Sequence, residues 1–241
     1  MNNFFEKQKK WLLDEKYQGK ANEDFDKDLK RLASGEPLDY IIGFIMFLNC
    51  KIDLRYKPLI PRPETEFWVK EAIEEMKESG KKNIEILDLF SGSGCIGIAL
   101  LKNIPNCSVC FADIDKNCLD QIKFNLKENQ IDENRFKIIK SDVFSNIESK
   151  YDYIFANPPY IPDARKIQKS VSRYEPANAL FGGTDGLKYI RIILKSFGNF
   201  LKEKGCLFLE IDSSHKKFFE EKKIKIFLDQ YARPRYVKIK C

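Results

Sequence analysis

The chain has few of the residues that build metal sites. Among its 241 residues there is a single histidine, His215, and the one Cys-x-x-Cys pair, Cys107 and Cys110, has no second pair to complete a zinc site. These two cysteines also fall in an apolar run that predicts a strand, where positions three apart point to opposite faces. We therefore expect no metal at the functional site.

The sequence also lacks the marks of an exported or membrane-bound protein. No apolar run is long enough to cross a bilayer, and the first residues do not have the layout of a signal peptide. The cysteine count of seven is odd, and the scattered positions favour reduced, mostly buried thiols over disulfides. They are Cys50, Cys95, Cys107, Cys110, Cys118, Cys206 and Cys241. We expect a cytoplasmic protein that has no membrane partner.

Basic residues slightly outnumber acidic ones, 42 to 36, which gives a net charge of +6. This balance suits a nucleic-acid or ribosome-associated partner without requiring one. Many of the basic residues gather near the C-terminus: Lys216, Lys217, Lys222, Lys223, Lys225, Arg233, Arg235, Lys238 and Lys240. A solvated helix face is the first interpretation of this cluster, and a surface that docks a protein or faces RNA is the alternative.

The N-terminal part of the sequence predicts a helical appendage followed by a hairpin. Residues 3–34 predict two short helices, too short to form a core alone and therefore expected to pack on the main domain or on a partner. Residues 40–60 predict a β-hairpin with its turn at 49–51. The expected units are a helical segment over 1–37, a hairpin linker over 38–63 and a main domain over 64–241.

The main domain alternates between strand and helix patterns. Strands are expected over residues 84–89, 108–112, 136–140, 151–156, 206–211, 224–228 and 236–239, and helices over about 64–79, 95–103, 116–129, 187–202 and 213–222. Such alternation predicts an α/β fold with a mostly parallel, doubly wound sheet that carries helices on both faces. The last two strands leave no room for a helix between them, so this final pair should be antiparallel.

A glycine-rich loop follows the first strand of this alternation and opens a helix. Gly92, Gly94 and Gly97 have the spacing of a dinucleotide-binding loop, and Asp113 ends the next strand, where an acid binds ribose hydroxyls. The loop and Asp113 together predict a ribose-bearing cofactor. They do not choose between NAD and S-adenosylmethionine, and a tight turn that binds no ligand is the plain alternative.

The tetrapeptide Asn-Pro-Pro-Tyr at positions 157–160 favours S-adenosylmethionine over NAD. It follows a buried strand, and its two prolines end the strand abruptly. Asn157 precedes a proline and is pushed toward extended dihedrals, at the edge where open α/β sheets bind ligands. Its side-chain oxygen and the Pro158 carbonyl can accept both hydrogens of a planar NH2 group, while Tyr160 packs on the plane. An ordinary strand-end turn is the alternative.

Such a clamp suits methyl transfer to a planar nitrogen, whose lone pair is delocalised and weakly nucleophilic. Two accepted hydrogen bonds would localise the lone pair and aim it at a methyl group, by positioning and electrostatics and without an obvious general base. A dehydrogenase has no need of this clamp. The predicted catalytic residues are Asn157, Pro158, Pro159 and Tyr160. Asp142, after the third strand, is placed to bind an adenine amine, and a turn or helix-cap acid is the alternative.

Longer motifs flank these two features. They read EPLDYIIG at 36–43, PRPETE at 61–66, YEPANALFGGTDGL at 174–187 and GCLFLEI at 205–211. With them, the chain resembles the glutamine side-chain amide methyltransferases of the HemK/PrmC type, which modify peptide chain release factors. The resemblance covers nearly everything from residue 36 onward. Phe90 stands where that family usually has the first glycine of its loop, so the turn must tolerate a side chain there.

The resemblance implies a class I, Rossmann-like methyltransferase that moves a methyl group from S-adenosylmethionine to the glutamine amide of a Gly-Gly-Gln motif in a release factor, leaving S-adenosylhomocysteine. It implies cofactor contacts at Phe90, Ser91, Gly92, Ser93, Gly94, Asp113, Ile114, Asp142, Val143 and Asn157. It implies substrate contacts at Asn157, Pro158, Pro159, Tyr160, Arg62 and Glu64.

The alternative function is a nucleic-acid methyltransferase that acts on an exocyclic amine of adenine or guanine in RNA or DNA. It would use the same clamp on a flipped-out base. No separate recognition domain is visible in the sequence, and the flanking motifs favour the protein-modifying family. An intact tetrapeptide speaks against a catalytically silent binding module, and an NAD-dependent oxidoreductase is the least favoured reading.

Overall fold

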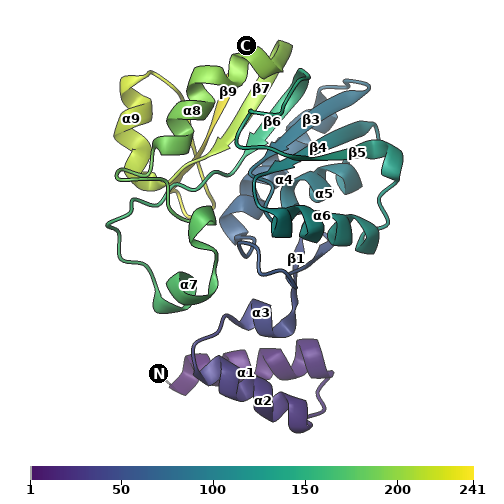
Figure 1. Cartoon of the computed structure of the whole chain (residues 1–241), viewed down its shortest axis with the longest axis vertical. Coiled ribbons are helices and arrows are strands. Elements are labelled where there is room, and N and C mark those ends of the chain that lie inside the picture. Colours follow the sequence, from purple (N-terminus) through teal and green to yellow (C-terminus); the bar gives the residue numbers. More distant parts are fainter. Residues whose placement is uncertain (1) are drawn as a thin grey trace.

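The computed structural model describes residues 2–241, and a seven-stranded sheet in the order β5-β4-β3-β6-β7-β9-β8 forms its centre (Figure 1). The strands are β3 Ile84–Leu89, β4 Cys107–Asp113, β5 Phe136–Lys140, β6 Tyr151–Ala156, β7 Leu201–Glu210, β8 Ile226–Leu228 and β9 Pro234–Lys240. The strands from β5 through β7 run parallel, and β9 is antiparallel to both β7 and β8. The predicted mostly parallel α/β sheet, with an antiparallel final pair, is confirmed.

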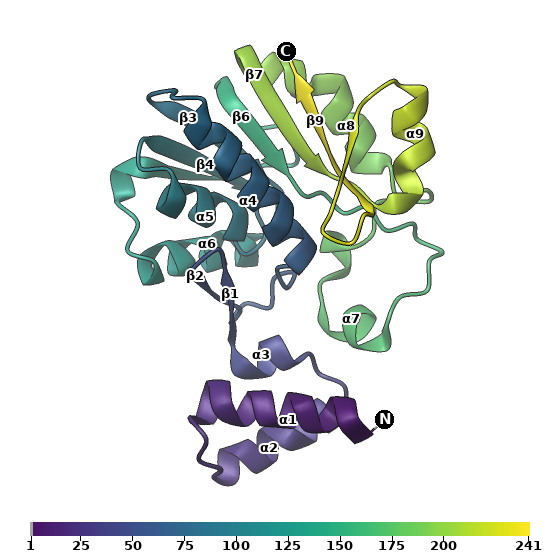
Figure 2. The ribbon, with the colours of Figure 1, turned by 180° about the vertical axis from the view of Figure 1, so that it is seen from behind.

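Helices cover both faces of the sheet because its strands are apolar on both sides. On one face lie α4 Pro63–Glu78, α5 Cys95–Asn103 and α6 Lys116–Glu128, which share a core with Ile86 and Phe155. On the other face lie α8 Lys188–Ser196 and α9 Lys216–Glu221, which share a core with Leu87 and Ile154 (Figures 1 and 2). Neighbouring residues of one strand therefore enter different cores, as strand geometry requires.

The largest difference from the predicted bounds in the main domain lies between α8 and β7. The helix expected over 187–202 ends at Ser196, a 3-10 turn spans Phe197–Phe200, and β7 begins at Leu201 rather than at 206. The early part of β7 is polar, and its register against β6 shifts between Tyr151 and Tyr153. Lys202 in this stretch binds the buried carboxylate of Asp152 at 3.1 Å. A strand that begins with charged residues and an irregular register lacks the apolar pattern that reveals strands in sequence.

The N-terminal helices form a small unit of their own, beside the carboxyl edge of the sheet (Figures 1 and 2). The unit consists of α1 Asn2–Tyr17, α2 Glu23–Ala33 and α3 Leu38–Ile42. Their shared core contains Leu12, Phe25, Leu32, Leu38 and Ile41. The sequence did not predict α3. α3 closes over the two longer helices and completes their core, and the expected packing of this unit on the main domain or on a partner stays a prediction.

The hairpin consists of β1 Phe44–Phe47 and β2 Cys50–Asp53. Its turn lies at Leu48 and Asn49, both with positive φ, so the predicted turn at 49–51 was placed late. Amide side chains of α6 fix the hairpin. The Asn125 Oδ1 accepts the backbone N–H of Asp53 at 2.9 Å, and its Nδ2 donates to the Ser93 carbonyl at 2.9 Å. The hairpin and the glycine-rich loop are therefore held by one side chain.

Six of the seven cysteines are buried, Cys241 is exposed, and all seven are free thiols, as the sequence predicted. Within residues 2–241, no helix combines the length and the hydropathy needed to cross a membrane.

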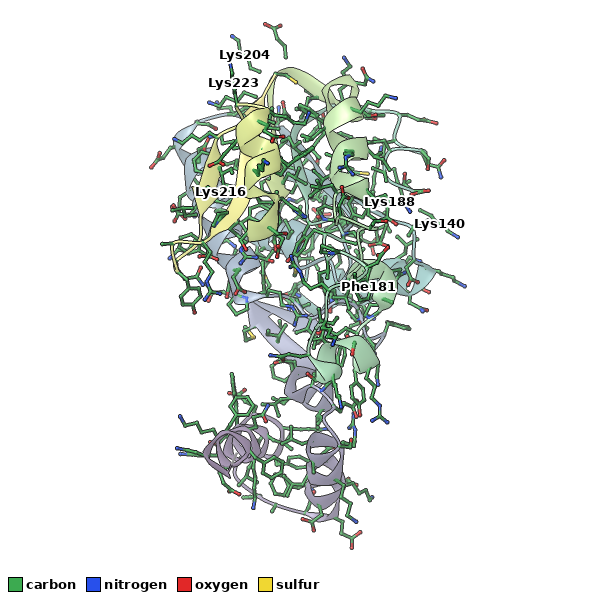
Figure 3. The ribbon with its side chains drawn as sticks, turned by 90° about the vertical axis from the view of Figure 1, so that its left-hand side faces the viewer. Lys140, Phe181, Lys188, Lys204, Lys216 and Lys223 are labelled. Carbon is green, nitrogen blue, oxygen red and sulfur yellow. The ribbon has the colours of Figure 1, made fainter. Side chains whose placement is uncertain are left out.

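The basic residues near the C-terminus divide between exposed and buried positions. Lys216, labelled in Figure 3, and Lys217 are exposed on α9, and each pairs with a glutamate one turn further along the same helix. Arg235 is largely buried on β9, where its guanidinium lies 3.1 Å from Asp229. The α9 pairs are what a solvated helix face provides, which favours the first interpretation of the cluster.

Candidate active site

A cavity of about 380 Å³ opens at the carboxyl edge of the sheet, within the size range of small-molecule sites. The residues that follow β3, β4, β5 and β6 line it together, because the carboxyl ends of parallel strands meet at one edge. Of the residues predicted to bind cofactor or substrate, the lining contains Arg62, Phe90, Ser91, Gly92, Ser93, Asp113, Ile114, Asp142, Val143, Asn157 and Pro159. Gly94 does not line the cavity; it is the N-cap of α5, with φ 81°.

Backbone geometry shapes the glycine-rich loop. Phe90 and Gly92 have φ values of 59° and 56°, in the left-handed region. Ser91 joins this loop to the neighbouring strand: its Oγ donates to the Asp88 carbonyl at 2.7 Å and accepts the N–H of Ala112 at 2.9 Å. The loop therefore turns sharply while remaining bonded to the sheet.

Asp113 is held at the end of β4 by two backbone donors. Its Oδ2 accepts the N–H of Gly92 at 2.8 Å, and its Oδ1 accepts the N–H of Asp115 at 2.9 Å. Burial raises the pKa of Asp113, and these two N–H groups oppose that effect. Each oxygen keeps a lone pair, so the carboxylate can accept hydrogen bonds from a pair of vicinal hydroxyls.

Asp88 lies beneath the loop and has a structural role. It is fully buried, and its Oδ2 accepts the N–H of Gly97 at 3.0 Å, which caps the first turn of α5. A Cβ on Gly97 would lie 2.2 Å from the ring of Phe111, so this glycine permits close packing of helix on strand. Burial, and secondarily the charge of Asp113, raise the pKa of Asp88 to about 8.

Asn157 leaves β6 beside the cavity, and Thr65 on α4 sets the orientation of its amide. The Thr65 hydroxyl donates its proton to Glu210 at 2.7 Å, so its oxygen must accept from the Asn157 Nδ2, 3.4 Å away. That arrangement turns the amide nitrogen toward α4. It leaves the Asn157 Oδ1 to accept a hydrogen bond from a ligand.

Glu210 holds both ends of the tetrapeptide from the interior. It is 0 % exposed at the end of β7, and its two oxygens accept from Thr65, from the Trp68 Nε1 at 2.7 Å and from the Tyr160 hydroxyl at 3.1 Å. Burial raises the pKa of Glu210, and these donors oppose the rise. A single buried carboxyl group thus fixes Tyr160 directly and Asn157 through Thr65.

Glycines 182 and 186 bring a backbone segment against the other side of the tetrapeptide. A Cβ on Gly186 would lie 2.2 Å from the Tyr160 carbonyl oxygen, and one on Gly182 would lie 2.5 Å from that of Pro159. Ile161 exchanges two backbone hydrogen bonds with this segment, through the Leu180 carbonyl and the Gly182 N–H, each at 2.9 Å. The tetrapeptide is therefore enclosed on both sides.

A second cavity, of about 490 Å³, shares part of its lining with the first. Asn157 and Arg62 line both cavities, whereas Pro158 and Tyr160 line only the second. The Arg62 guanidinium holds the buried carboxylate of Glu175 at 2.6 and 2.8 Å, which ties the start of α4 to the segment after α7 Lys169–Tyr174. The predicted clamp, residues 157–160, therefore contributes to the lining of both cavities.

Comparison with known proteins shows the family of the chain. Residues 71–174 match the family model described as the methyltransferase small domain. The chain is 34% identical over 238 residues to the release factor glutamine methyltransferase of Streptococcus pneumoniae, a match that covers 94% of this chain and 83% of the relative. It is 37% identical over 192 residues to that of Thermodesulfovibrio yellowstonii, covering 78% of this chain and 68% of the relative.

The chain belongs to the release factor glutamine methyltransferase family. The resemblance stated from the motifs is therefore confirmed, and the chain is a methyltransferase. Among solved structures, the T. thermophilus 16S rRNA N2 G1207 methyltransferase, in complex with AdoMet and guanosine, matches with a TM-score of 0.57 and 15% identity, over 82% of this chain and 49% of that one. At that identity the likeness concerns the fold alone, which is the predicted methyltransferase fold.

The sequence pointed to 11 of the 26 residues that line the methyltransferase's first cavity and missed those that support its clamp. Thr65 and Glu210 stood inside quoted motifs but received no role, and Tyr189 was not singled out. The available signal was the acid that ends an otherwise apolar strand, since buried acids need partners. Glu64 lines neither cavity, and its predicted contact with substrate stays a prediction.

Proposed function

We propose that this methyltransferase transfers a methyl group from S-adenosylmethionine to the side-chain amide nitrogen of the glutamine in the Gly-Gly-Gln motif of a peptide chain release factor. One observation carries the proposal: Asn157 lines both cavities and directs its carboxamide oxygen away from Thr65. An amide entering from the second cavity would meet this oxygen beside the first. Membership of the family supports the choice of substrate.

The residues of the first cavity fit S-adenosylmethionine. The Asp113 carboxylate is oriented to accept from the ribose hydroxyls, and the exposed Asp142 lines the cavity where it can accept from an adenine amine. Ile114 and Val143 add apolar lining, and the loop at 90–94 lets the backbone approach the ligand. When bound, S-adenosylmethionine supplies an electrophilic methyl group on a positively charged sulfur.

The clamp residues then act on the incoming glutamine. The Asn157 Oδ1 and the Pro158 carbonyl accept its two N–H groups, which localises the nitrogen lone pair and turns it toward the first cavity. Tyr160, held by Glu210, packs beside the amide plane. The nitrogen–carbon bond forms as the carbon–sulfur bond breaks, and the surplus proton on nitrogen leaves to water. Positioning supplies the rate, so no general base is assigned.

We propose three units for the chain, over residues 1–37, 38–63 and 64–241. Most residues that line the two cavities belong to the last unit. The exception is the segment 59–62 at the end of the linker, which contributes Leu59 and Arg62 to each cavity. We propose that the linker is part of the catalytic machinery rather than a passive connection.

Labelled S-adenosylmethionine tests the proposal directly. The purified protein is offered intact release factor, release factor with the motif glutamine changed to alanine, and a mixture of RNA and DNA. We expect label on the intact release factor alone. Label that appears only in nucleic acid would contradict the proposal and support methylation of a base amine.

A further inference from the structure

Phe90 occupies the position beside Asn157 at the carboxyl edge of the sheet. Strands β3 and β6 are parallel and pair Leu89 with Ala156 in their last register position. The next residues, Phe90 and Asn157, therefore leave adjacent strands at the same edge of the sheet. Both line the first cavity. Under the proposed function, Phe90 is thus next to the place where the methyl group is transferred.

The backbone of Phe90 is unfavourable for a phenylalanine. Its φ of 59° lies in the left-handed region, which glycine adopts readily and other residues rarely do. A glycine would avoid this strain. Strained residues persist where the surrounding structure holds them and where the side chain contributes to the site. The Phe90 ring is therefore the feature that needs an explanation.

A second aromatic ring supports that of Phe90. Tyr189, at the start of α8, also lines the cavity, and the two half-buried rings meet edge to face with centroids 5.4 Å apart and planes at 70°. Lys188 Nζ lies 4.9 Å from the centroid of the Tyr189 ring, so that ring already has a cation beside it (Figure 3 labels Lys188). Phe90 is the member of the pair available to a ligand cation.

Aromatic faces attract cations, and the attraction increases where water is excluded. The cofactor and its product differ there in charge: the sulfur of S-adenosylmethionine is a cationic sulfonium, and that of S-adenosylhomocysteine is a neutral thioether. We propose that Phe90, supported by Tyr189, recognises the sulfonium charge, so that the enzyme binds S-adenosylmethionine in preference to its own product. The inference rests on the proposed function and assigns a selectivity residue within it.

Calorimetric titration with S-adenosylmethionine and S-adenosylhomocysteine tests this inference without measuring catalysis. In Phe90→Leu, which keeps apolar bulk but has no aromatic face, we expect the ratio of the Kd for the product to the Kd for the cofactor to fall about five-fold. Phe90→Tyr should keep the wild-type ratio. Tyr189→Leu should lower it about two-fold, because that ring acts through Phe90.

Phe227→Leu is the matched control, since Phe227 also stacks on a tyrosine, at 5.0 Å from Tyr236, but lines neither cavity. Its ratio should equal that of the wild type. An unchanged ratio in both Phe90→Leu and Tyr189→Leu would overturn the inference and leave the proposed function intact. If the wild-type protein bound neither compound, the proposed function itself would fail.

Discussion

The two rims of the first cavity are built in different ways. The loop at 90–94 is shaped by its left-handed dihedrals and by bonds to β4, the next strand in the chain, where Ser91 bonds to Ala112 and Gly92 to Asp113. The tetrapeptide at 157–160 is held by groups from distant parts of the chain, above all Glu210 and Gly186. The cofactor rim thus depends on two strands that follow one another in the chain, β3 and β4, whereas the substrate rim also needs α4 and β7 from the assembled domain. Changes at the two rims should therefore have separable effects.

Asn157→Ala should separate the rate of methyl transfer from the affinity for the cofactor more than any other change. Loss of the carboxamide oxygen removes one of the two groups that localise the nitrogen lone pair, so we expect the rate of transfer to release factor to fall by about 10²–10³-fold. The Kd for S-adenosylmethionine should change little, because the loop and Asp113 are untouched. Single-turnover transfer and calorimetry measure the two quantities. Asn134→Ala, at an exposed site, serves as the control, and near-normal turnover in Asn157→Ala would contradict the clamp.

Gly186→Ala tests how far the substrate rim depends on distant packing. The new Cβ would lie 2.2 Å from the Tyr160 carbonyl, at a φ of +75°. We expect the free energy of unfolding to fall by about 2–4 kcal/mol, from backbone strain and overpacking together. Gly80→Ala is the matched control: its φ is +63° but nothing lies within 4 Å, so only the strain of about 1 kcal/mol should appear in urea unfolding. Equal losses in both variants would show that the close approach contributes nothing.

Asp113→Ala addresses the cofactor rim. It removes the acceptor proposed for the ribose hydroxyls and frees the N–H of Gly92. We expect binding of S-adenosylmethionine to weaken by roughly 1–3 kcal/mol, measured by calorimetry. At saturating cofactor, the rate of transfer should stay within a few-fold of the wild type. A collapse of that rate with unchanged affinity would reverse the roles assigned to the two rims.

Asp88, beneath the cofactor loop, gives the stability of the protein a pH dependence of its own. Burial raises the pKa of Asp88 to about 8 in the folded protein, whereas in the unfolded chain it is near 4. Between pH 4 and pH 8, the unfolded chain therefore binds fewer protons than the folded one. Stability should therefore fall as pH rises through this window, by on the order of 1 kcal/mol per pH unit. Asp88→Asn should make the fall of the unfolding free energy between pH 5 and 8 less steep, while Asp113 and Glu210 keep their own contributions. The same slope in wild type and variant would show that Asp88 does not titrate there.

The same contrast explains what the sequence could predict. The bounds of β3, α5, β5 and β6 agree with their apolar runs, and the loop at 90–94 and Asp113 have the spacing of a known motif. These features are decided within short stretches of chain. The Thr65–Glu210 hydrogen bond joins residues 145 positions apart, and α3 exists because two other helices offer it a core. Contacts of this kind leave no periodic trace in the sequence.

A structure with S-adenosylhomocysteine and a Gly-Gly-Gln peptide tests the central claim most directly. The peptide should enter through the second cavity, with its glutamine nitrogen about 3 Å from both the Asn157 Oδ1 and the Pro158 carbonyl oxygen. That nitrogen should also face the sulfur of the cofactor product. A glutamine bound elsewhere, or an Asn157 carboxamide turned away from it, would contradict the account.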